Sequence, residues 1–194
     1  MHIIIGIKLD RVLYIIENNG YSIKDLDNLK EKLNNLGCAH TIRVSITHLE
    51  IVAFCKDSKT LRDKITKSIG SRILDIFIGE PEVKNGKELS DFMSFLDNEL
   101  FWLAHTFMEN PWKSYNDKKL QSLVLYAGAL AKAQEGDKKA AINLIQMAKD
   151  LGGDELIDMD CAIKQIDLIF QNQRTSASRC LNVEQITNHM RPKT

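Results

Sequence analysis

Apolar residues in the first part of the chain follow two different periods, which predicts an alternation of strands and helices. An every-second-residue pattern and short β-branched runs are typical of strands, because successive side chains point to opposite faces. The runs that predict strands lie at residues 2–7, 12–16, 41–47, 51–54 and 73–78. Apolar spacings of three and four residues predict helices at residues 22–36 and 58–69, each followed by a glycine.

The order of these elements predicts a ferredoxin-like unit. Strand, helix, strand, strand, helix, strand is the order of the split β-α-β fold, and the run at residues 2–7 adds one strand before it. Ser22, with Asp25 three residues later, has the pattern of a helix N-cap. Because this fold hosts many unrelated activities, it leaves the function of the first part open.

The second part of the chain has helical periodicity throughout. A wide apolar face predicts a helix from residue 89 to residue 107, and Asn110–Pro111 predicts its end, because the residue before proline avoids the helical region. Further helices are predicted at residues 117–131, 138–151 and 154–170, with a short one at 181–190. The short connections between them favour antiparallel neighbours in a helical bundle.

A polar segment with proline and glycine, Glu80–Gly86, separates the two parts and predicts a domain boundary. We therefore expect an α+β protein. Its parts would be a ferredoxin-like α/β domain at residues 1–83, an all-α antiparallel helical bundle at 87–173, and a C-terminal tail at 174–194.

Charge and hydropathy narrow the class of protein. Lys plus Arg and Asp plus Glu number 26 each, so the chain lacks the basic surplus that usually accompanies nucleic-acid binding. The basic run from Lys56 to Lys67 includes acids and is typical of a solvated helix face. No apolar run reaches the roughly 18 residues of a membrane span, and the first residues lack the features of a signal peptide. A cytoplasmic location is expected, with no membrane contact.

The cysteines give little indication of a metal site. They lie at Cys38, Cys55, Cys161 and Cys180, without a C-x-x-C pair. In a cytoplasmic protein we expect reduced thiols, while a disulfide between distant elements stays an alternative. The sequence indicates no cofactor and no metal site, and the common phosphate-binding, metalloprotease and serine-hydrolase motifs are absent.

One patch in the first predicted helix of the second part has residues that carry chemistry. His105 and Glu109 are four residues apart, so a helix places both on one face, where they could bind a metal ion or move a proton. The alternative is structural: Phe101 and Trp112 pack around the histidine, and Gln121 hydrogen-bonds a buried polar group. The spacing of His105 and Glu109 alone does not decide between a structural role, a ligand pocket and a catalytic site.

The segment Phe101–Trp112, with its His-x-x-x-Glu and a nearby tryptophan, resembles the family catalogued as domain of unknown function 309. Segments 120–131 and 134–141 are similar to the second and third helices of that family, and the resemblance extends over residues 88–150. It implies a small helical bundle whose biochemical role is not established. This chain has Thr106 where the family usually has an acid and Ser122 where a glycine is common.

Three functional hypotheses follow. The first is a non-catalytic interaction protein whose helical bundle offers a groove around His105, Glu109 and Trp112 to a protein partner or to a second copy. The second is an enzyme, such as a hydrolase, that uses His105 as a base oriented by Glu109. The third is a nucleic-acid accessory protein that uses the face between Lys56 and Lys67. A tetratricopeptide-like hairpin at residues 129–148 would also suit peptide binding, although no repeat is present.

Overall fold

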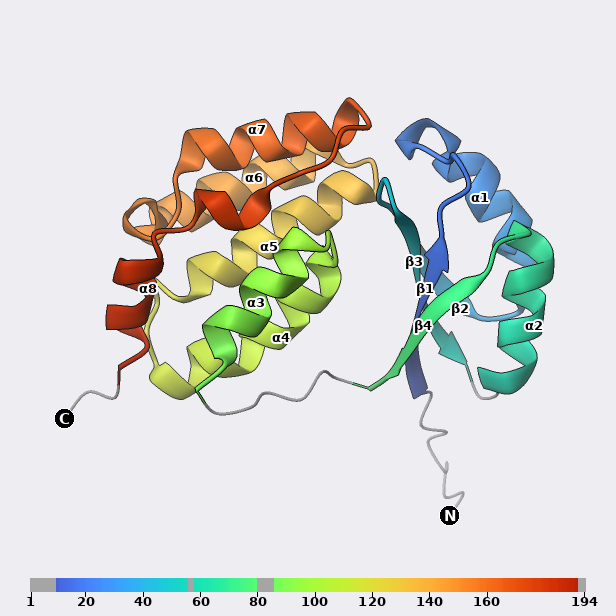
Figure 1. Cartoon of the computed structure of the whole chain (residues 1–194), viewed down its shortest axis with the longest axis horizontal. Coiled ribbons are helices and arrows are strands. Elements are labelled where there is room, and N and C mark those ends of the chain that lie inside the picture. The colour runs from blue at the N-terminus through green and yellow to red at the C-terminus, as the bar shows by residue number, and fades with distance from the viewer. Residues whose placement is uncertain (1–9, 56–57, 80–85, 192–194) are drawn as a thin grey trace, which may run out of the picture. The chain divides into compact units, whose positions relative to one another are not determined.

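The computed structural model describes residues 10–55, 58–79 and 86–191. The chain divides into two compact units, Met1–Gly79 and Glu80–Thr194. The first contains a sheet with helices and the second is helical (Figure 1), so the predicted α+β class is confirmed. The strand predicted at residues 2–7 lies outside the described residues.

The first unit contains a four-stranded sheet in the order β2-β3-β1-β4, in which all neighbouring strands are antiparallel. Both of its α-helices lie on one side of this sheet (Figure 1). The chain order β-α-β-β-α-β is the predicted one. The strands are β1 (Asp10–Glu17), β2 (Ala39–Val44), β3 (His48–Cys55) and β4 (Ile73–Ile78), and the helices are α1 (Leu26–Leu33) and α2 (Ser58–Ile69).

The two-residue period of the strands explains which sheet face meets the helices. Val12, Tyr14 and Ile16 point to the same face of β1 and are buried in one core. Leucines and isoleucines of α1 and α2 complete that core, among them Leu29, Leu33, Leu61 and Ile65. The predicted cap is also present, because the backbone N–H of Ser22 donates to the Asp25 carboxylate at 2.7 Å.

The opposite face of β2 and β3 carries a buried group of charged residues. Arg43 and Glu50 are directly paired in the β2–β3 register and are 3% and 0% exposed. The guanidinium Nη1 of Arg43 lies 3.7 Å from Glu50 Oε2, and His48 Nε2 lies 3.9 Å from Glu50 Oε1. Burying an ion is costly unless an opposite charge accompanies it, so Arg43 and Glu50 depend on each other.

The second unit is built around α5 (Gln121–Gln134), which packs against α4, α6 and α7. Nearly every α5 residue is buried, because the helix has neighbours on several sides. The other helices are α3 (Glu88–Asp97), α4 (Phe101–Tyr115), α6 (Lys138–Asp150), α7 (Met159–Phe170) and α8 (Val183–His189), with short 3-10 turns η3 (Gly153–Glu155) and η4 (Ala177–Cys180).

Two predicted features of the first helical hairpin are wrong. The helix expected from residue 89 to residue 107 is divided into α3 and α4 at Glu99, whose φ of 58° ends the first helix. The stop expected at Pro111 does not occur, because α4 continues to Tyr115 with Pro111 inside it. Pro111 is buried on the same side as Leu103 and Phe107, so packing of this face outweighs the backbone hydrogen bond that proline removes.

The helix expected to begin at Asp154 begins instead at Met159, where Asp158 is its N-cap and accepts a hydrogen bond from Cys161 N–H at 2.9 Å. Gly153 lies in the preceding 3-10 turn, η3, beneath a close approach of α5. A Cβ atom on Gly153 would lie 2.5 Å from Ser122 Cβ and 2.6 Å from the Ala148 carbonyl oxygen. Only glycine fits there without a shift of the backbone.

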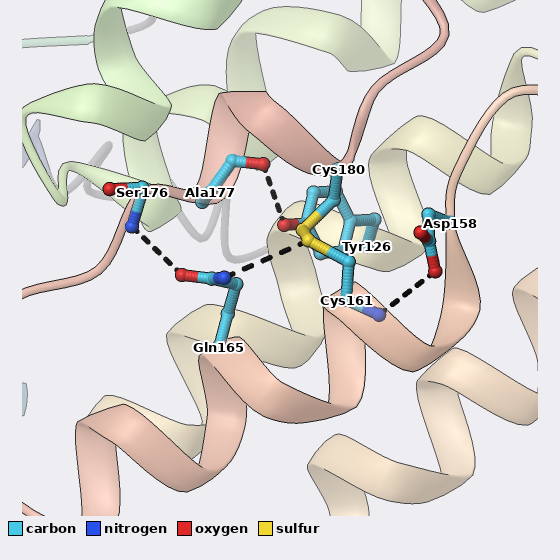
Figure 2. Close-up of a disulfide and its surroundings, with 7 residues drawn as sticks. All are labelled: Tyr126, Asp158, Cys161, Gln165, Ser176, Ala177 and Cys180. Atoms are coloured by element: carbon cyan, nitrogen blue, oxygen red, sulfur yellow. Dashed lines mark hydrogen bonds between the residues drawn. A yellow bond between two sulfur atoms is a disulfide. The ribbon is translucent and has the colours of Figure 1, made fainter.

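The expectation of reduced thiols is wrong as well. Cys161 and Cys180 form a disulfide that joins α7 to η4 (Figure 2). None of the cysteines in the described part of the chain is free. The bond was not predictable from spacing, because the two residues are 19 positions apart and only the path of the chain after α7 brings them together.

Replacing Gly153 with alanine is expected to destabilise the second unit by about 1–3 kcal/mol, the usual cost of overpacking. The Cβ of the new alanine would lie too close to Ser122 and to a backbone oxygen. Rotation of a side chain cannot relieve the contact with the backbone. Urea unfolding should show the loss. The double variant with Ser122→Gly should recover only part of it, and an unchanged midpoint for Gly153→Ala would contradict the packing described.

Replacing Glu50 with alanine is expected to cost about 3–5 kcal/mol in the free energy of unfolding, because the buried guanidinium of Arg43 would lose the carboxylate that lies 3.7 Å from it. The matched control is Glu17→Ala on β1, whose ion pair with Arg72 is exposed and is worth roughly 0–1 kcal/mol. Equal losses in the two variants, measured by urea unfolding, would show that Glu50 and Arg43 do not depend on each other.

Candidate functional site

The outward side of α4 carries a row of four half-buried residues, Trp102, His105, Glu109 and Trp112, which we call the α4 stripe. Their spacings of three, four and three residues keep them on one side of the helix. The opposite side of α4, with Leu103, Phe107 and Pro111, is buried in the core. The stripe therefore belongs to the surface of the second unit while its backbone is held by the packing of α4.

His105 is held in one orientation by α5. Its Nδ1 lies 3.0 Å from the carbonyl oxygen of Val124, which can only accept, so Nδ1 carries the proton. The imidazole ring also stacks on Trp102, with ring centres 5.2 Å apart. A Cβ atom on Gly128 would lie 3.1 Å from Nδ1, so the ring can approach α5 this closely because residue 128 has no side chain.

The second ring nitrogen of His105 is available for chemistry. Nε2 makes no hydrogen bond with any described residue and is not among the buried polar atoms without a partner. With the proton on Nδ1, Nε2 presents its lone pair at the surface. It can accept a hydrogen bond, take a proton or bind a metal ion.

Glu109 does not orient the histidine as expected. Its Oε2 accepts from Lys113 Nζ at 2.7 Å, one turn further along α4, and no hydrogen bond to His105 is present. Partial burial alone would raise the pKa of the Glu109 carboxyl. The hydrogen bond and charge of Lys113, with smaller contributions from Trp112 and His105, more than offset this and leave the pKa below its ordinary value. Glu109 is therefore an ionised carboxylate already paired with a cation.

Trp112 closes the stripe at the C-terminal end of α4. Its indole Nε1 is buried and has no hydrogen bond of good geometry, although it lies close enough to Glu109 to lower the pKa of that carboxyl. Lys113 Nζ lies 5.8 Å from the centre of the Trp112 ring, within reach of a cation–π contact. The carboxylate of Glu109 is the nearby acceptor that this N–H faces, so the indole nitrogen belongs to the interactions within the stripe.

Two of the predicted patch residues lie apart from this surface. Phe101 is fully buried and belongs to the core of α4. Gln121 begins α5 and is half-buried, but it makes no hydrogen bond to the stripe. Trp102 was missed by the sequence interpretation, although its position three residues before His105 was a usable signal.

Thr106 and Ser122, the two positions at which the sequence differs from the pattern it resembles, are both buried. Thr106 is buried on the inner side of α4. Residue 106 therefore does not face the stripe, and as a threonine it carries no carboxylate. Ser122 is fully buried and its hydroxyl donates to the Lys119 carbonyl, beside Gly153. Neither residue reaches the outward surface of His105.

The described residues also bear on metal, membrane and nucleic-acid binding. No group of three or more His, Cys, Asp or Glu in residues 10–55, 58–79 and 86–191 could hold a metal ion. No helix in these ranges is both long and apolar enough to cross a membrane. On α2, Arg62, Lys64 and Lys67 are exposed beside the exposed Asp63, while Lys56 lies outside the described residues.

Comparison with known proteins identifies only the helical part. No curated protein and no solved structure matches the chain. Residues 89–144 match the model of a family described as Domain of unknown function (DUF309), which confirms the resemblance seen in the sequence. The match extends from α3 into α6 and includes the whole α4 stripe, whereas α7, η4 and the disulfide lie outside it.

Proposed function

We propose that this chain is a non-catalytic interaction protein that binds a protein partner through the α4 stripe. The observation that carries the proposal is the arrangement of two half-buried tryptophans beside a histidine with a fixed ring and a free Nε2. Tryptophan is enriched among the residues that dominate binding energy at protein interfaces, because it offers a large, rigid contact area. The helix that carries the stripe is held in a packed core, so little ordering would be needed on binding.

The chemistry of the stripe indicates the kind of partner. Glu109 and Lys113 neutralise each other, so the surface has no strong net charge to attract a nucleic acid or a highly charged ligand. The Trp112 ring can supply apolar contact, and His105 Nε2 can accept a hydrogen bond. A peptide segment with apolar side chains and a main-chain N–H and C=O suits this surface. The cytoplasm remains the proposed location.

A hydrolytic enzyme is the second candidate, favoured by the accessible Nε2 of His105. The Val124 carbonyl holds the imidazole in the tautomer that a general base needs. The sequence had suggested Glu109 for this orienting role. Against this candidate, the carboxylate of Glu109 is paired with Lys113, and no described contact supplies a nucleophile beside the imidazole. The enzyme hypothesis therefore rests on one nitrogen atom.

The test is selection of ligands from a displayed library of random peptides, followed by titration of the selected peptides against the full chain. Trp112→Phe, which keeps an aromatic ring but reduces its contact area, should weaken binding about fivefold, since roughly 40 Å² less apolar contact is worth on the order of 1 kcal/mol. His105→Ala should weaken it also. The matched control is Met147→Ala, which removes an exposed apolar side chain 52% accessible on α6 and should leave binding unchanged.

Three results would contradict or redirect this proposal. Peptides that bind equally well to wild type and to Trp112→Phe and His105→Ala would remove the stripe as the docking surface. Concentration-dependent dimerisation of the wild type, lost in Trp112→Ala, would make a second copy the occupant. Hydrolysis of model esters or amides that disappears in His105→Ala but persists in Met147→Ala would favour the enzyme.

A further inference from the structure

The α4 stripe has the same spacing in both directions along the helix. Trp102, His105, Glu109 and Trp112 are separated by three, four and three residues, so a tryptophan stands at each end and the histidine and the carboxylate lie between them. At 1.5 Å per residue the stripe is about 15 Å long. Its centre lies midway between His105 and Glu109. A surface with this spacing can face an inverted copy of itself.

A twofold axis through that centre pairs each residue of the stripe with its counterpart at the other end. Two α4 helices that pack antiparallel bring Trp102 opposite Trp112 of the second copy. They also bring His105 opposite Glu109 of the second copy. By symmetry each of these contacts occurs twice, which is the property of an isologous interface that closes as a dimer.

The carboxylate of Glu109 is able to accept a donor from a second copy. Partial burial raises the pKa of this carboxyl, but Lys113 and smaller contributions more than offset that effect, so the group is ionised. The Glu109 side chain is 35% exposed. An ionised carboxylate has about four lone-pair positions, so it can keep Lys113 and accept a further hydrogen bond.

His105 supplies the matching donor in one protonation state only. Nδ1 donates to the Val124 carbonyl oxygen, so a second proton can enter the ring only at Nε2. The protonated ring donates from Nε2 to a facing carboxylate, whereas the neutral ring presents a lone pair that the carboxylate repels. Histidine changes its charge between about pH 5 and pH 8. Antiparallel pairing of two stripes therefore favours protonated His105 and takes up protons.

No acidic side chain in the described part of the chain already binds His105. On α4 the nearest charged residues are Glu109 and Lys113, which pair with each other. On α5 the ring lies against Val124 and Gly128, neither of which titrates. The next residues along α5 and α6 are an ion pair, Lys132 with Glu135, and an apolar side chain, Leu144. The carboxylate that a protonated Nε2 needs would therefore come from the second copy.

The two tryptophans supply the apolar contact of such a dimer. Both are half-buried in the single chain, and the ring of Trp102 is positioned by its stacking on His105. Tryptophan is enriched among the residues that dominate binding at protein interfaces. Because Trp102 and Trp112 lie at the two ends of the stripe, they exclude water from the histidine–carboxylate pairs between them, and a hydrogen bond is stronger where water is excluded.

We propose that the α4 stripe binds the α4 stripe of a second copy in an antiparallel dimer, and that protonation of His105 strengthens this dimer. The inference rests on the function proposed above, because it takes the stripe as the docking surface and names its partner. Four half-buried side chains offer less than the roughly 800 Å² per partner of a standard interface, so the dimer is expected to be weak and transient.

The test is sedimentation equilibrium of the full chain at roughly 1 µM to 1 mM, at about pH 5.5 and about pH 8 and at equal ionic strength. The dissociation constant of the dimer should be roughly 100-fold larger at the higher pH. Two charge-assisted hydrogen bonds are lost there, and each contributes about tenfold. His105→Ala, confirmed as folded by urea unfolding, should lose this pH dependence although it keeps the other four histidines.

Glu109→Gln tests the other side of the pair. The variant keeps the size of the side chain and removes its charge, so it should weaken the dimer roughly 100-fold at the lower pH and abolish most of the pH dependence. The matched control is Glu155→Gln, which removes a carboxylate paired with Lys119 at 2.6 Å and should change neither.

Trp112→Phe tests the apolar ends of the stripe. It should weaken the dimer by about fivefold at each of the two symmetric contacts, or roughly 25-fold in total, because each contact loses apolar area. Met147→Ala, on α6, is the control and should dimerise as the wild type does.

A chain that stays monomeric at the lower pH would overturn the dimer. Selected peptides whose binding still depends on Trp112 and His105 would then leave the stripe as the docking surface for another protein, so failure of the dimer is distinguishable from failure of the proposed function. A dimer of equal strength at both pH values, or of equal strength in Glu109→Gln and the wild type, would be held by other contacts and would also overturn the inference.

Discussion

The close packing of α5 against its neighbours is the constraint on which the second unit depends. Small residues along this helix, including Ala127, Gly128 and Ala131, let other helices approach its backbone. That approach brings His105 to the Val124 carbonyl on one side of α5. On another side it places the Tyr126 hydroxyl 2.9 Å from the Ala177 carbonyl oxygen, in the segment after α7. The α4 stripe and the segment after α7 are therefore both positioned by one buried helix.

The polar groups that this packing buries need hydrogen-bond partners, and the partners available to each group determine the chemistry of the site. His105 satisfies Nδ1 with a main-chain carbonyl, which leaves Glu109 to pair with Lys113. A histidine and a carboxylate four residues apart thus belong to two different interactions. The geometry of α4 permits a dyad, and the neighbouring helix determines that none forms.

The spacing of hydrophobic residues predicted most of the fold. Each strand or helix buries one face, and that face can be read from the local sequence. The β-α-β-β-α-β order and the helical second part followed from it. It failed where tertiary contacts override local rules: α4 continues through Pro111, and Glu99 adopts a left-handed φ with a buried carboxylate. The disulfide could not be predicted either, since the spacing of cysteines along the chain does not show which of them are close in space. In the candidate site, helical spacing placed His105 and Glu109 on one face of α4, but the contacts of His105 with Trp102 and with the Val124 carbonyl depend on tertiary packing.

The extent of the family match divides the second unit into two parts. All of the α4 stripe lies within residues 89–144, and so do Glu99 and Tyr126, which hydrogen-bond to Thr175 and Ala177 in the segment after α7. Gln165 and both cysteines of the disulfide lie outside that range. The matched helices therefore supply the whole α4 stripe, and they also supply two of the side chains that hold the chain after them. The stripe can form from the matched helices alone, whereas the disulfide depends on the segment that follows them.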